Sequence, residues 1–352
     1  MRLGRWGIAA GVAVLTVVGS VVAVGSPAES ASRNREGFRE RERERDRDRQ
    51  RRQTGRSYDA RDTGSSQAPA RFVAEFEGRI VVVSAETGRA ERYLTDVKAG
   101  GGASRPAVSP DGRRVWFSRS EGGCAAHLAS VPVVGGKEEK VPGSGEAGPE
   151  TLPLPRPGRP QLAYARINCE KLSSALMVGD FEGLEGHGQS GLLPLAWNRA
   201  GDRLLARSAT GGEIRLLEIN KAGGIAANTP LEPTDTTADC RLEVFAFSPD
   251  DNNGYVAVRR CGQSGDRGRR SLVLLDKDGK LRKTVLRLSR SQDFTDRPVF
   301  DATGHSLLYA TVPAVRGDNA GNDRPVTLWL WRDGESRRLE RQTRFRHPAW
   351  LP

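Results

Sequence analysis

Residues 105–117 read Arg-Pro-Ala-Val-Ser-Pro-Asp-Gly-Arg-Arg-Val-Trp-Phe, which is a short apolar segment, a turn and a second apolar segment. Related stretches follow at residues 152–164, 195–206, 245–258 and 298–309, and a truncated copy lies at 348–352. Their turn residues recur after 46, 43, 50 and 53 positions, at Gly112, Gly158, Gly201, Asp251 and Gly304. A repeat of about 40 to 50 residues, with strands and turns in each unit, is typical of a β-propeller.

Each repeat unit reads as four strands. In the first copy, Asp111-Gly112 predicts a tight two-residue hairpin turn between the first two strands, because this pair readily adopts positive φ angles. The third strand of a unit is aliphatic and the fourth is more polar, as in residues 272–275 and 280–288. A charged outermost strand protects a blade from pairing with other chains.

The two ends of the repeat region complement each other. Residues 71–95 supply a second, third and fourth strand without a first strand, whereas residues 345–350 supply a first strand alone. Pairing of these segments would complete one shared blade and close the ring. With five full units, the sequence therefore predicts an all-β, six-bladed β-propeller over residues 71–352, closed by its N- and C-terminal strands.

The repeat signature resembles that of TolB-type propellers, in which Ser-Pro-Asp-Gly follows a proline and an apolar pair. The matching residues are Ser109, Pro110, Asp111, Gly112, Ser248, Pro249 and Asp250. The resemblance implies that they build turns, so we do not expect a catalytic Ser–Asp pair among them. It also implies three settings, since propellers of this type act in envelope complexes, precede serine peptidase domains or are related to polysaccharide lyases.

The first 32 residues read as an export signal. Arg2 and Arg5 precede residues 8–25, a run of eighteen residues without a charge, and small residues follow. A basic start, an apolar core and a small-residue tail are typical of a secretory signal peptide. Because residues 8–25 are also just long enough to span a bilayer, an uncleaved anchor that gives membrane association stays open.

Residues 33–70 are predicted to be a disordered charged linker. Arg alternates with acidic residues at 39–49, and the linker has too little apolar surface to order itself by burial. Of the net charge of +11, the first 70 residues contribute 14 Arg against 9 acidic residues, and the rest contribute 41 basic against 35 acidic residues. A mildly basic body without clustered Lys and Arg does not indicate nucleic-acid binding.

The four cysteines predict two disulfides, as expected of an exported protein. Cys240 and Cys261 lie symmetrically about the turn of one predicted hairpin, so antiparallel pairing places them opposite one another. Cys124 and Cys169 each follow the second strand of successive units, and a bridge between them would join neighbouring blades. Metal binding is the alternative, but no Cys-x-x-Cys spacing occurs.

Little in the sequence indicates catalysis. No Gly-x-Ser-x-Gly motif occurs, and the four histidines are scattered along the chain at His127, His187, His305 and His347. Lyases of this fold use histidines around a divalent metal, which leaves that chemistry open without favouring it. The Asp-rich stretch at 250–253 lacks the alternate spacing of a calcium loop. We predict no metal and no cofactor, and we assign the tryptophans in strands to core packing.

The leading hypothesis is an exported, non-enzymatic propeller that acts as a protein-interaction platform at the bacterial cell envelope, either secreted or held by a single-pass anchor. Its partner would be an envelope protein, contacted by loops at 183–191, 225–238 and 312–325. The alternative is a carbohydrate-binding or carbohydrate-active propeller that uses its central channel. Clustered His, Trp and acidic residues at one channel mouth would favour that alternative. A third hypothesis is the sensory ectodomain of a membrane assembly.

Overall fold

The computed structural model describes residues 70–98, 101–234, 237, 239–249, 254–262, 268–314, 326–339 and 345–352. The predicted signal or anchor at 1–32, the predicted linker at 33–70 (apart from Ala70) and Asp250 lie outside the described residues. Within the described ranges, no helix is long and apolar enough to cross a membrane.

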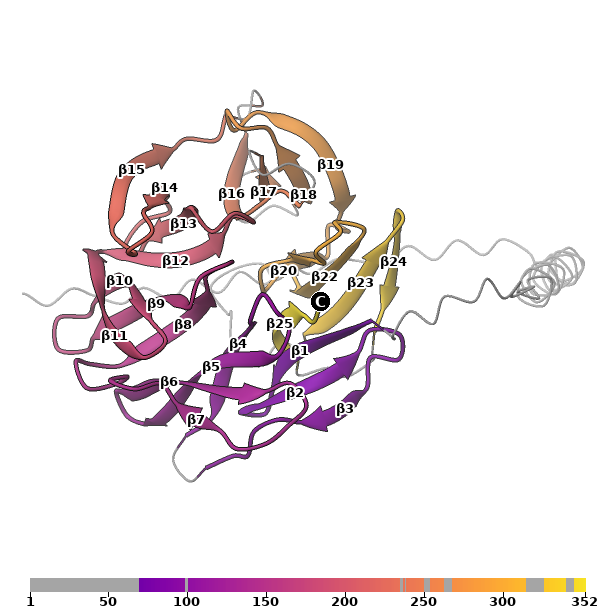
Figure 1. Ribbon diagram of the computed structural model, residues 1–352. Helices are drawn as coiled ribbons and strands as arrows, with labels where there is room; N and C mark the ends of the chain where they lie inside the picture. Colours follow the sequence, from indigo (N-terminus) through magenta and orange to yellow (C-terminus); the bar gives the residue numbers. More distant parts are fainter. Residues whose placement is uncertain are drawn as a thin grey trace, which may run out of the picture. The chain divides into compact units, whose positions relative to one another are not determined.

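The described strands form six antiparallel sheets, the blades of a β-propeller (Figure 1). Blade 1 contains β25 (Arg346–Trp350), β1 (Arg71–Phe76), β2 (Arg79–Ser84) and β3 (Ala90–Tyr93). Blade 2 contains β4 (Ala103–Val108), β5 (Arg114–Gly122), β6 (Ala125–Pro132) and β7 (Glu139–Lys140). Blade 3 contains β8 (Glu150–Pro155), β9 (Gln161–Asn168), β10 (Ser173–Asp180) and β11 (Gly183–Ser190).

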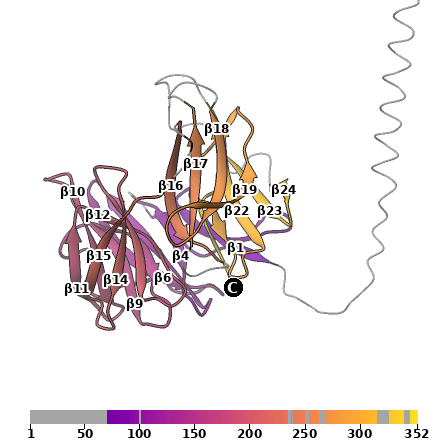
Figure 2. The same cartoon turned by 90° about the horizontal axis from the view of Figure 1, so that it is seen from above.

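Blade 4 contains β12 (Leu192–Trp197), β13 (Arg203–Ser208), β14 (Ile214–Ile219) and β15 (Ile225–Leu231). Blade 5 contains β16 (Cys240–Phe247), β17 (Tyr255–Cys261), β18 (Arg269–Leu275) and β19 (Leu281–Arg287), of which Figure 2 shows β16, β17 and β18 side by side. Blade 6 contains β20 (Gln292–Phe294), β21 (Val299–Phe300), β22 (Ser306–Pro313), β23 (Thr327–Arg332) and β24 (Glu335–Arg338). The predicted all-β, six-bladed fold is therefore confirmed.

The ring is closed in blade 1, where the two ends of the propeller pair. Strand β25 runs antiparallel to β1, with Phe72 opposite Trp350 and Val73 opposite Ala349. The backbone N–H of Leu351 donates to Arg71 O, in the first residue of β1, over 3.0 Å. Because one sheet contains both ends, the predicted closure by N- and C-terminal strands is confirmed.

The hydrophobic core lies between neighbouring blades, as β2 illustrates. Its residues Ile80, Val81, Val82 and Val83 are all buried. Ile80 and Val82 pack with blade 2, while Val81 and Val83 pack with blade 6, because successive side chains of a strand point to opposite faces. A strand covered on both faces therefore reads as a continuous aliphatic run. Four further clusters join the other neighbouring blades in the same way.

The turn between β4 and β5 differs from the predicted two-residue hairpin. Only Gly112 has a positive φ, of 68°, and the Ser109 N–H bonds to Arg114 O over 2.8 Å, so that four residues lie between them. The Ser109 hydroxyl accepts the Arg114 N–H over 2.9 Å and donates to Asp111 over 2.5 Å. The prediction was wrong because Asp111 does not adopt a positive φ and Pro110 has no N–H with which to close a two-residue turn, so the last hydrogen bond of the hairpin lies at Ser109.

Two of the three predicted contact loops are outer strands instead. Residues 183–190 form β11 of blade 3, and residues 225–231 form β15 of blade 4. The glycines of β11 do not mark a loop, because a Cβ added to Gly186 would lie 2.0 Å from Val178 O, so this glycine permits close pairing. Most of the third segment, residues 315–325, lies outside the described residues.

Candidate functional site

The innermost strands of all six blades line one cavity of about 900 Å³. Its walls come from β4, β8, β12, β16, β20, β21 and β25, from the turns that adjoin them and from individual positions of β13, β14 and β17. In Figure 1, β4, β8, β12, β16, β20 and β25 lie toward the middle of the ring, while β3, β7, β11, β15, β19 and β24 form its outer edge. A cavity of this size suits ligand binding, so we take this central channel as the candidate site.

A bulge shapes the channel wall at one repeat position. The register of β4, β8 and β25 shifts there. The residues within the shifts are Arg105, Leu152 and His347, with φ angles of 53°, 56° and 50°, and each precedes a proline. A bulge re-aims a side chain away from the regular alternation of a strand. The wall of the channel can therefore present side chains that a regular strand would turn into a blade interface.

His347 is held between two carboxylates at this level of the channel. Its ring Nδ1 lies 3.1 Å from Glu75 Oε2, and its ring Nε2 lies 3.6 Å from Asp296 Oδ1. The backbone N–H of His347 donates to Asp296 Oδ2 over 3.2 Å. Burial acts to raise the pKa of Glu75, but the hydrogen bond and charge of His347, the Arg105 N–H and Arg346 together hold that pKa below its usual value. The network ties blades 1, 2 and 6 together.

Arg297 lies in the segment between β20 and β21 of blade 6. Its Nη1 donates to Leu195 O of blade 4 over 3.3 Å, so the side chain reaches past blade 5. Burial, followed by the positive charges of Arg207 and Arg105, lowers the pKa of Arg297 to about 10. The guanidinium therefore remains charged at neutral pH, in a place where water solvates it poorly.

Acidic side chains of the channel wall have donors of their own. Glu243 pairs with Arg260, and Asp301 accepts from the Thr303 hydroxyl over 3.0 Å and the Ser306 N–H over 3.2 Å. The third carboxylate of the wall, that of Asp296, contacts the ring and the backbone N–H of His347. These acids therefore orient the protein's own groups.

Four arginines of the wall differ from these acids. Among the residues that the structure describes, no carboxylate lies within ion-pairing distance of the guanidinium groups of Arg105, Arg199, Arg207 and Arg297. The sequence analysis did not identify these residues. One signal could have revealed two of them, because Arg105 and Arg297 occupy the same repeat position, directly before a proline, as does His347.

Prolines limit what the backbone of the channel wall can offer. Five innermost segments carry one that lines the channel, at Pro106, Pro153, Pro194, Pro298 and Pro348. Proline lacks an N–H and blunts the free edge of a strand. Polar recognition in this channel therefore depends mainly on side chains.

Two tryptophans line the channel and also join its blades. The indole Nε1 of Trp197 donates to Leu154 O of blade 3 over 3.0 Å, and that of Trp350 donates to Val299 O of blade 6 over 2.8 Å. Blades 5 and 6 carry phenylalanine at the same repeat position. These two rings therefore pack between neighbouring blades and also form part of the channel wall, whereas the sequence predicted core packing alone.

The remaining histidines do not gather at the channel. His127 lies in β6 of blade 2, His187 in β11 of blade 3 and His305 in the turn before β22 of blade 6, whereas His347 lies in blade 1. Within the described ranges, no three His, Cys, Asp or Glu side chains are grouped as a metal site would require. The histidine-rich metal centre left open by the sequence is therefore not assembled by these residues.

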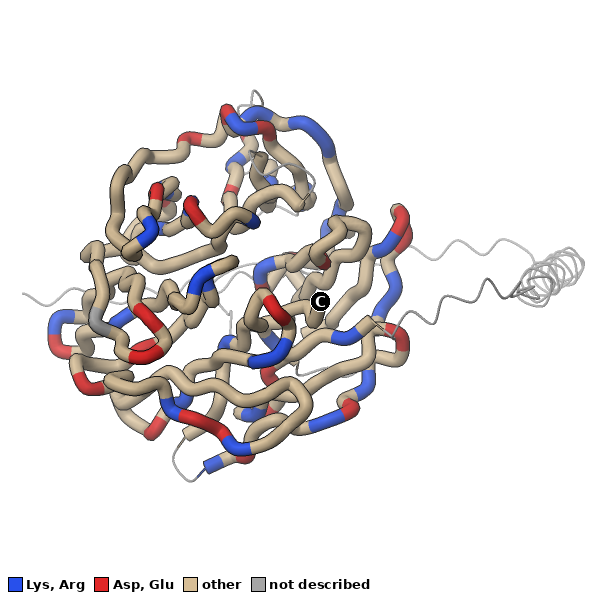
Figure 3. Tube along the Cα trace, viewed as in Figure 1, with Lys and Arg blue, Asp and Glu red and all other residues tan. Residues whose placement is uncertain are grey.

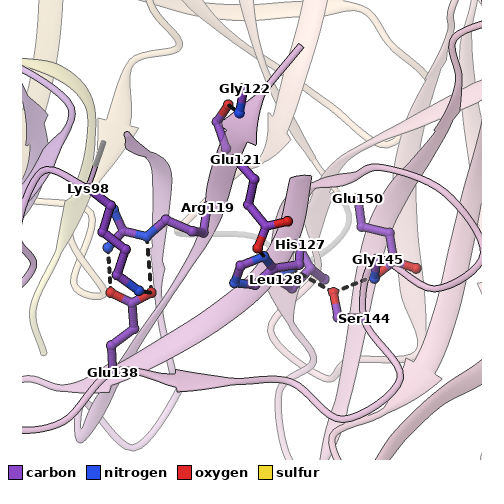
Figure 4. A network of polar contacts seen from close by, with 11 residues as sticks. Lys98, Arg119, Glu121, Gly122, His127, Leu128, Glu138, Ser144, Gly145 and Glu150 are labelled. Carbon is purple, nitrogen blue, oxygen red and sulfur yellow. Dashed lines mark hydrogen bonds and ion pairs between the residues drawn. The ribbon is translucent and has the colours of Figure 1, made fainter. Parts of the chain in front are cut away.

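A second polar network lies in blade 2 and at its junction with blade 3 (Figure 4). The buried Arg119 forms an ion pair with Glu138, which also accepts from Lys98 Nζ over 3.3 Å. Burial acts to raise the pKa of Glu138, but these two cations hold it below its usual value. Every charge in this group thus has a partner within the protein.

Glu150 forms the other half of this network. Its side chain has no exposed surface, and it accepts from Arg166 over 2.8 Å, from Ser144 Oγ over 2.7 Å and from the Gly145 N–H over 3.2 Å. A buried carboxylate is tolerated only when it is paired and hydrogen-bonded in this way. We interpret this group as structural.

Both predicted disulfides are present. Cys124 and Cys169 join blades 2 and 3, with their Cα atoms 6.4 Å apart. Cys240 and Cys261 lie directly opposite each other in β16 and β17, with their Cα atoms 4.0 Å apart. Disulfides persist in oxidising compartments, so the pairing is consistent with an extracytoplasmic protein.

Comparison with known proteins supports the fold. Neither a protein-family profile nor a curated protein sequence matches the chain. The structure is similar to TolB from Acinetobacter baumannii, with a TM-score of 0.53 and 14% identity, over 82% of this chain and 68% of that one. It is also similar to a TolB-assigned protein from Agrobacterium tumefaciens, with a TM-score of 0.51 and 16% identity, over 77% of this chain and 88% of that one. At these identities the likeness concerns the fold alone, which is a six-bladed β-propeller similar to those of the TolB proteins.

Proposed function

We propose that the protein is an exported, non-enzymatic β-propeller that serves as a protein-interaction platform at the bacterial cell envelope, and that its partner docks at the central channel. The observation that carries this proposal is the channel itself, whose wall offers arginines without carboxylate partners. The disulfides and the predicted signal or anchor at 1–32 support the location. The TolB-type fold is compatible with such a role.

In-cell photo-crosslinking of the full-length protein tests this proposal. A photoreactive amino acid at Gly212 would line the channel, and its Cβ would meet no atom within 4 Å. Gly183 in the outer strand β11 is the matched control, because a Cβ there also meets nothing within 4 Å. We expect an adduct with an envelope protein from Gly212 and not from Gly183. Adducts from Gly183 alone, or no protein adduct at all, would contradict docking at the channel.

Carbohydrate binding is the second candidate function. It is favoured by the position of His347, Trp350 and Asp296 in one channel, because a histidine, a tryptophan and an acidic residue grouped there suit the binding of a sugar. Against it, the indole N–H of Trp350 is already bonded to a neighbouring blade. Titration of the full-length protein with neutral and uronic oligosaccharides, followed by calorimetry, would separate the two functions.

A further inference from the structure

We propose that the central channel recognises a carboxylate-bearing segment of its protein partner through the guanidinium groups of Arg105, Arg207 and Arg297. This inference rests on the proposed function, since it names the chemistry of the partner that docks there. The three side chains line the same cavity, although they lie far apart in the sequence.

The placement of the three arginines is regular. Arg105 belongs to blade 2, Arg207 to blade 4 and Arg297 to blade 6, so the three come from every second blade of the ring, and Arg199 in the β12–β13 turn of blade 4 also lines the cavity. Arg297 reaches across to the backbone of blade 4, and its charge interacts with those of the other two arginines. All three side chains therefore line one cavity, and Arg105 and Arg207 lie near enough to Arg297 for their charges to act on it.

Mutual repulsion among these cations gives an anion an energetic role. Arg297 is poorly solvated, and the charges of Arg207 and Arg105 disfavour its protonated form. An oppositely charged group within about 4 to 6 Å favours the charged form of such a side chain. A bound carboxylate would thus relieve repulsion and also accept charge-assisted hydrogen bonds, which guanidinium groups make in bidentate geometry.

The protein's own carboxylates do not fill this role. Asp296 is bonded to His347, and Glu243 is paired with Arg260. Both still interact with Arg297 at a distance, and they act to raise its pKa against the larger opposing effects. The channel wall therefore keeps a surplus of positive charge.

The rest of the wall favours a peptide over a small anion. A cavity of about 900 Å³ greatly exceeds the size of one phosphate or carboxylate. The positions between the arginines carry apolar residues and prolines, such as Leu152, Pro153 and Pro194. A segment with acidic side chains beside apolar ones matches such a surface in both charge and polarity.

Selection from a library of randomised short peptides, displayed on beads and presented to the tagged full-length protein, tests this inference. We expect the retained sequences to be rich in Asp and Glu beside apolar residues. Affinities of retained peptides, measured by fluorescence anisotropy, should fall about tenfold or more in Arg207→Gln and in Arg297→Gln, because a charge-assisted hydrogen bond is lost. Arg297→Lys, which keeps the charge, should recover part of the affinity.

The matched control is Arg287→Gln, which removes the same charge from the exposed outer strand β19. It should leave peptide affinity unchanged. Retention of no peptides, or of peptides without acidic residues, would overturn the inference. Equal loss in Arg287→Gln would do the same, since the effect would then come from net charge.

Two further arms identify other sources of negative charge. Inorganic phosphate and an oligogalacturonate are added as competitors and as direct ligands. Binding of either one without any acidic peptide would overturn the peptide inference. The proposed function is tested separately by the adduct at Gly212, so a protein adduct there combined with failure of peptide binding would reject the acidic chemistry alone.

Discussion

The junction of blades 2 and 3 and the central channel use arginine in opposite ways. At the junction, Arg166 is bonded to Glu150, which has no exposed surface, and a disulfide joins the same two blades. In the channel, Arg207 and Arg297 line one cavity without a carboxylate partner among the described residues. Charges that are matched internally hold a structure together, whereas unmatched charges around a cavity are available to a ligand. Figure 3 shows that both signs of charge also occur along the outer edge of the ring.

The largest effect is expected at the junction, from Glu150→Ala. This change leaves the Arg166 guanidinium and the Ser144 hydroxyl without their shared acceptor. Breaking a buried ion pair by removing one partner costs about 3 to 5 kcal/mol, and the Gly145 N–H loses its acceptor as well. Urea unfolding measures the loss. Glu150→Gln, which retains an acceptor, should lose less, and equal losses in the two variants would contradict a role for the charge.

Removing the disulfides should have the next largest effect. The 45-residue separation of Cys124 and Cys169 and the 21-residue separation of Cys240 and Cys261 correspond to about 4 and about 3 kcal/mol in the chain-entropy treatment. Paired Cys→Ser variants, compared by urea unfolding under oxidising conditions, measure both. The bridge between blades should contribute more than the bridge within one hairpin. The reverse order would indicate that strain or residual unfolded structure outweighs loop length.

A smaller effect is expected from His127, near the junction. Burial lowers the pKa of His127, against the opposing charge of Glu121, and Nδ1 lies 2.9 Å from a Glu121 oxygen without the alignment of a hydrogen bond. A folded-state pKa below the unfolded value of about 6.5 gives stability that is present above that pH and lost as the pH falls toward the folded value.

We therefore expect thermal stability to decline as the pH is lowered from 7 to below 6, and to decline less in His127→Gln. The exposed His305, in the turn of blade 6, provides the control variant His305→Gln, which should behave as the parent protein does. A parent protein whose stability does not change over this interval would contradict the assignment.

The fold could be predicted from the sequence because the turn residues recur at a regular spacing that is typical of a propeller. Aliphatic runs such as that of β2 reveal strands covered on both faces, and the symmetry of Cys240 and Cys261 about one turn reveals their pairing. The turn type escaped prediction, since Pro110 changes the geometry that Asp-Gly alone would favour. The glycines of residues 183–190 led to the prediction of a loop, but these residues form strand β11, in which glycine permits close strand pairing.

The channel arginines could be found only in part. The shared position of Arg105 and Arg297 before a proline is visible in the sequence, but Arg207 belongs to a second strand with no such signature. Whether a basic side chain is paired depends on carboxylates that can be distant in sequence, as the contact of His347 with Glu75 shows. Local patterns contain the strands of a blade, whereas the charge balance of the channel arises only when six blades meet.

The smallest effect on stability is expected from Arg207→Gln. This variant tests directly whether the channel arginines differ from the paired charges at the junction of blades 2 and 3. This exposed side chain of the channel has no ion-pair partner among the described residues, so its replacement should change the free energy of unfolding by less than about 0.5 kcal/mol. Removal of repulsion toward Arg297 should make any change favourable. Urea unfolding at low and high salt measures this, because screening weakens repulsion between exposed charges. If Arg207→Gln instead destabilised the protein as strongly as Glu150→Ala, the channel arginines would have to be part of the scaffold, and the distinction between matched and unmatched charge would fail.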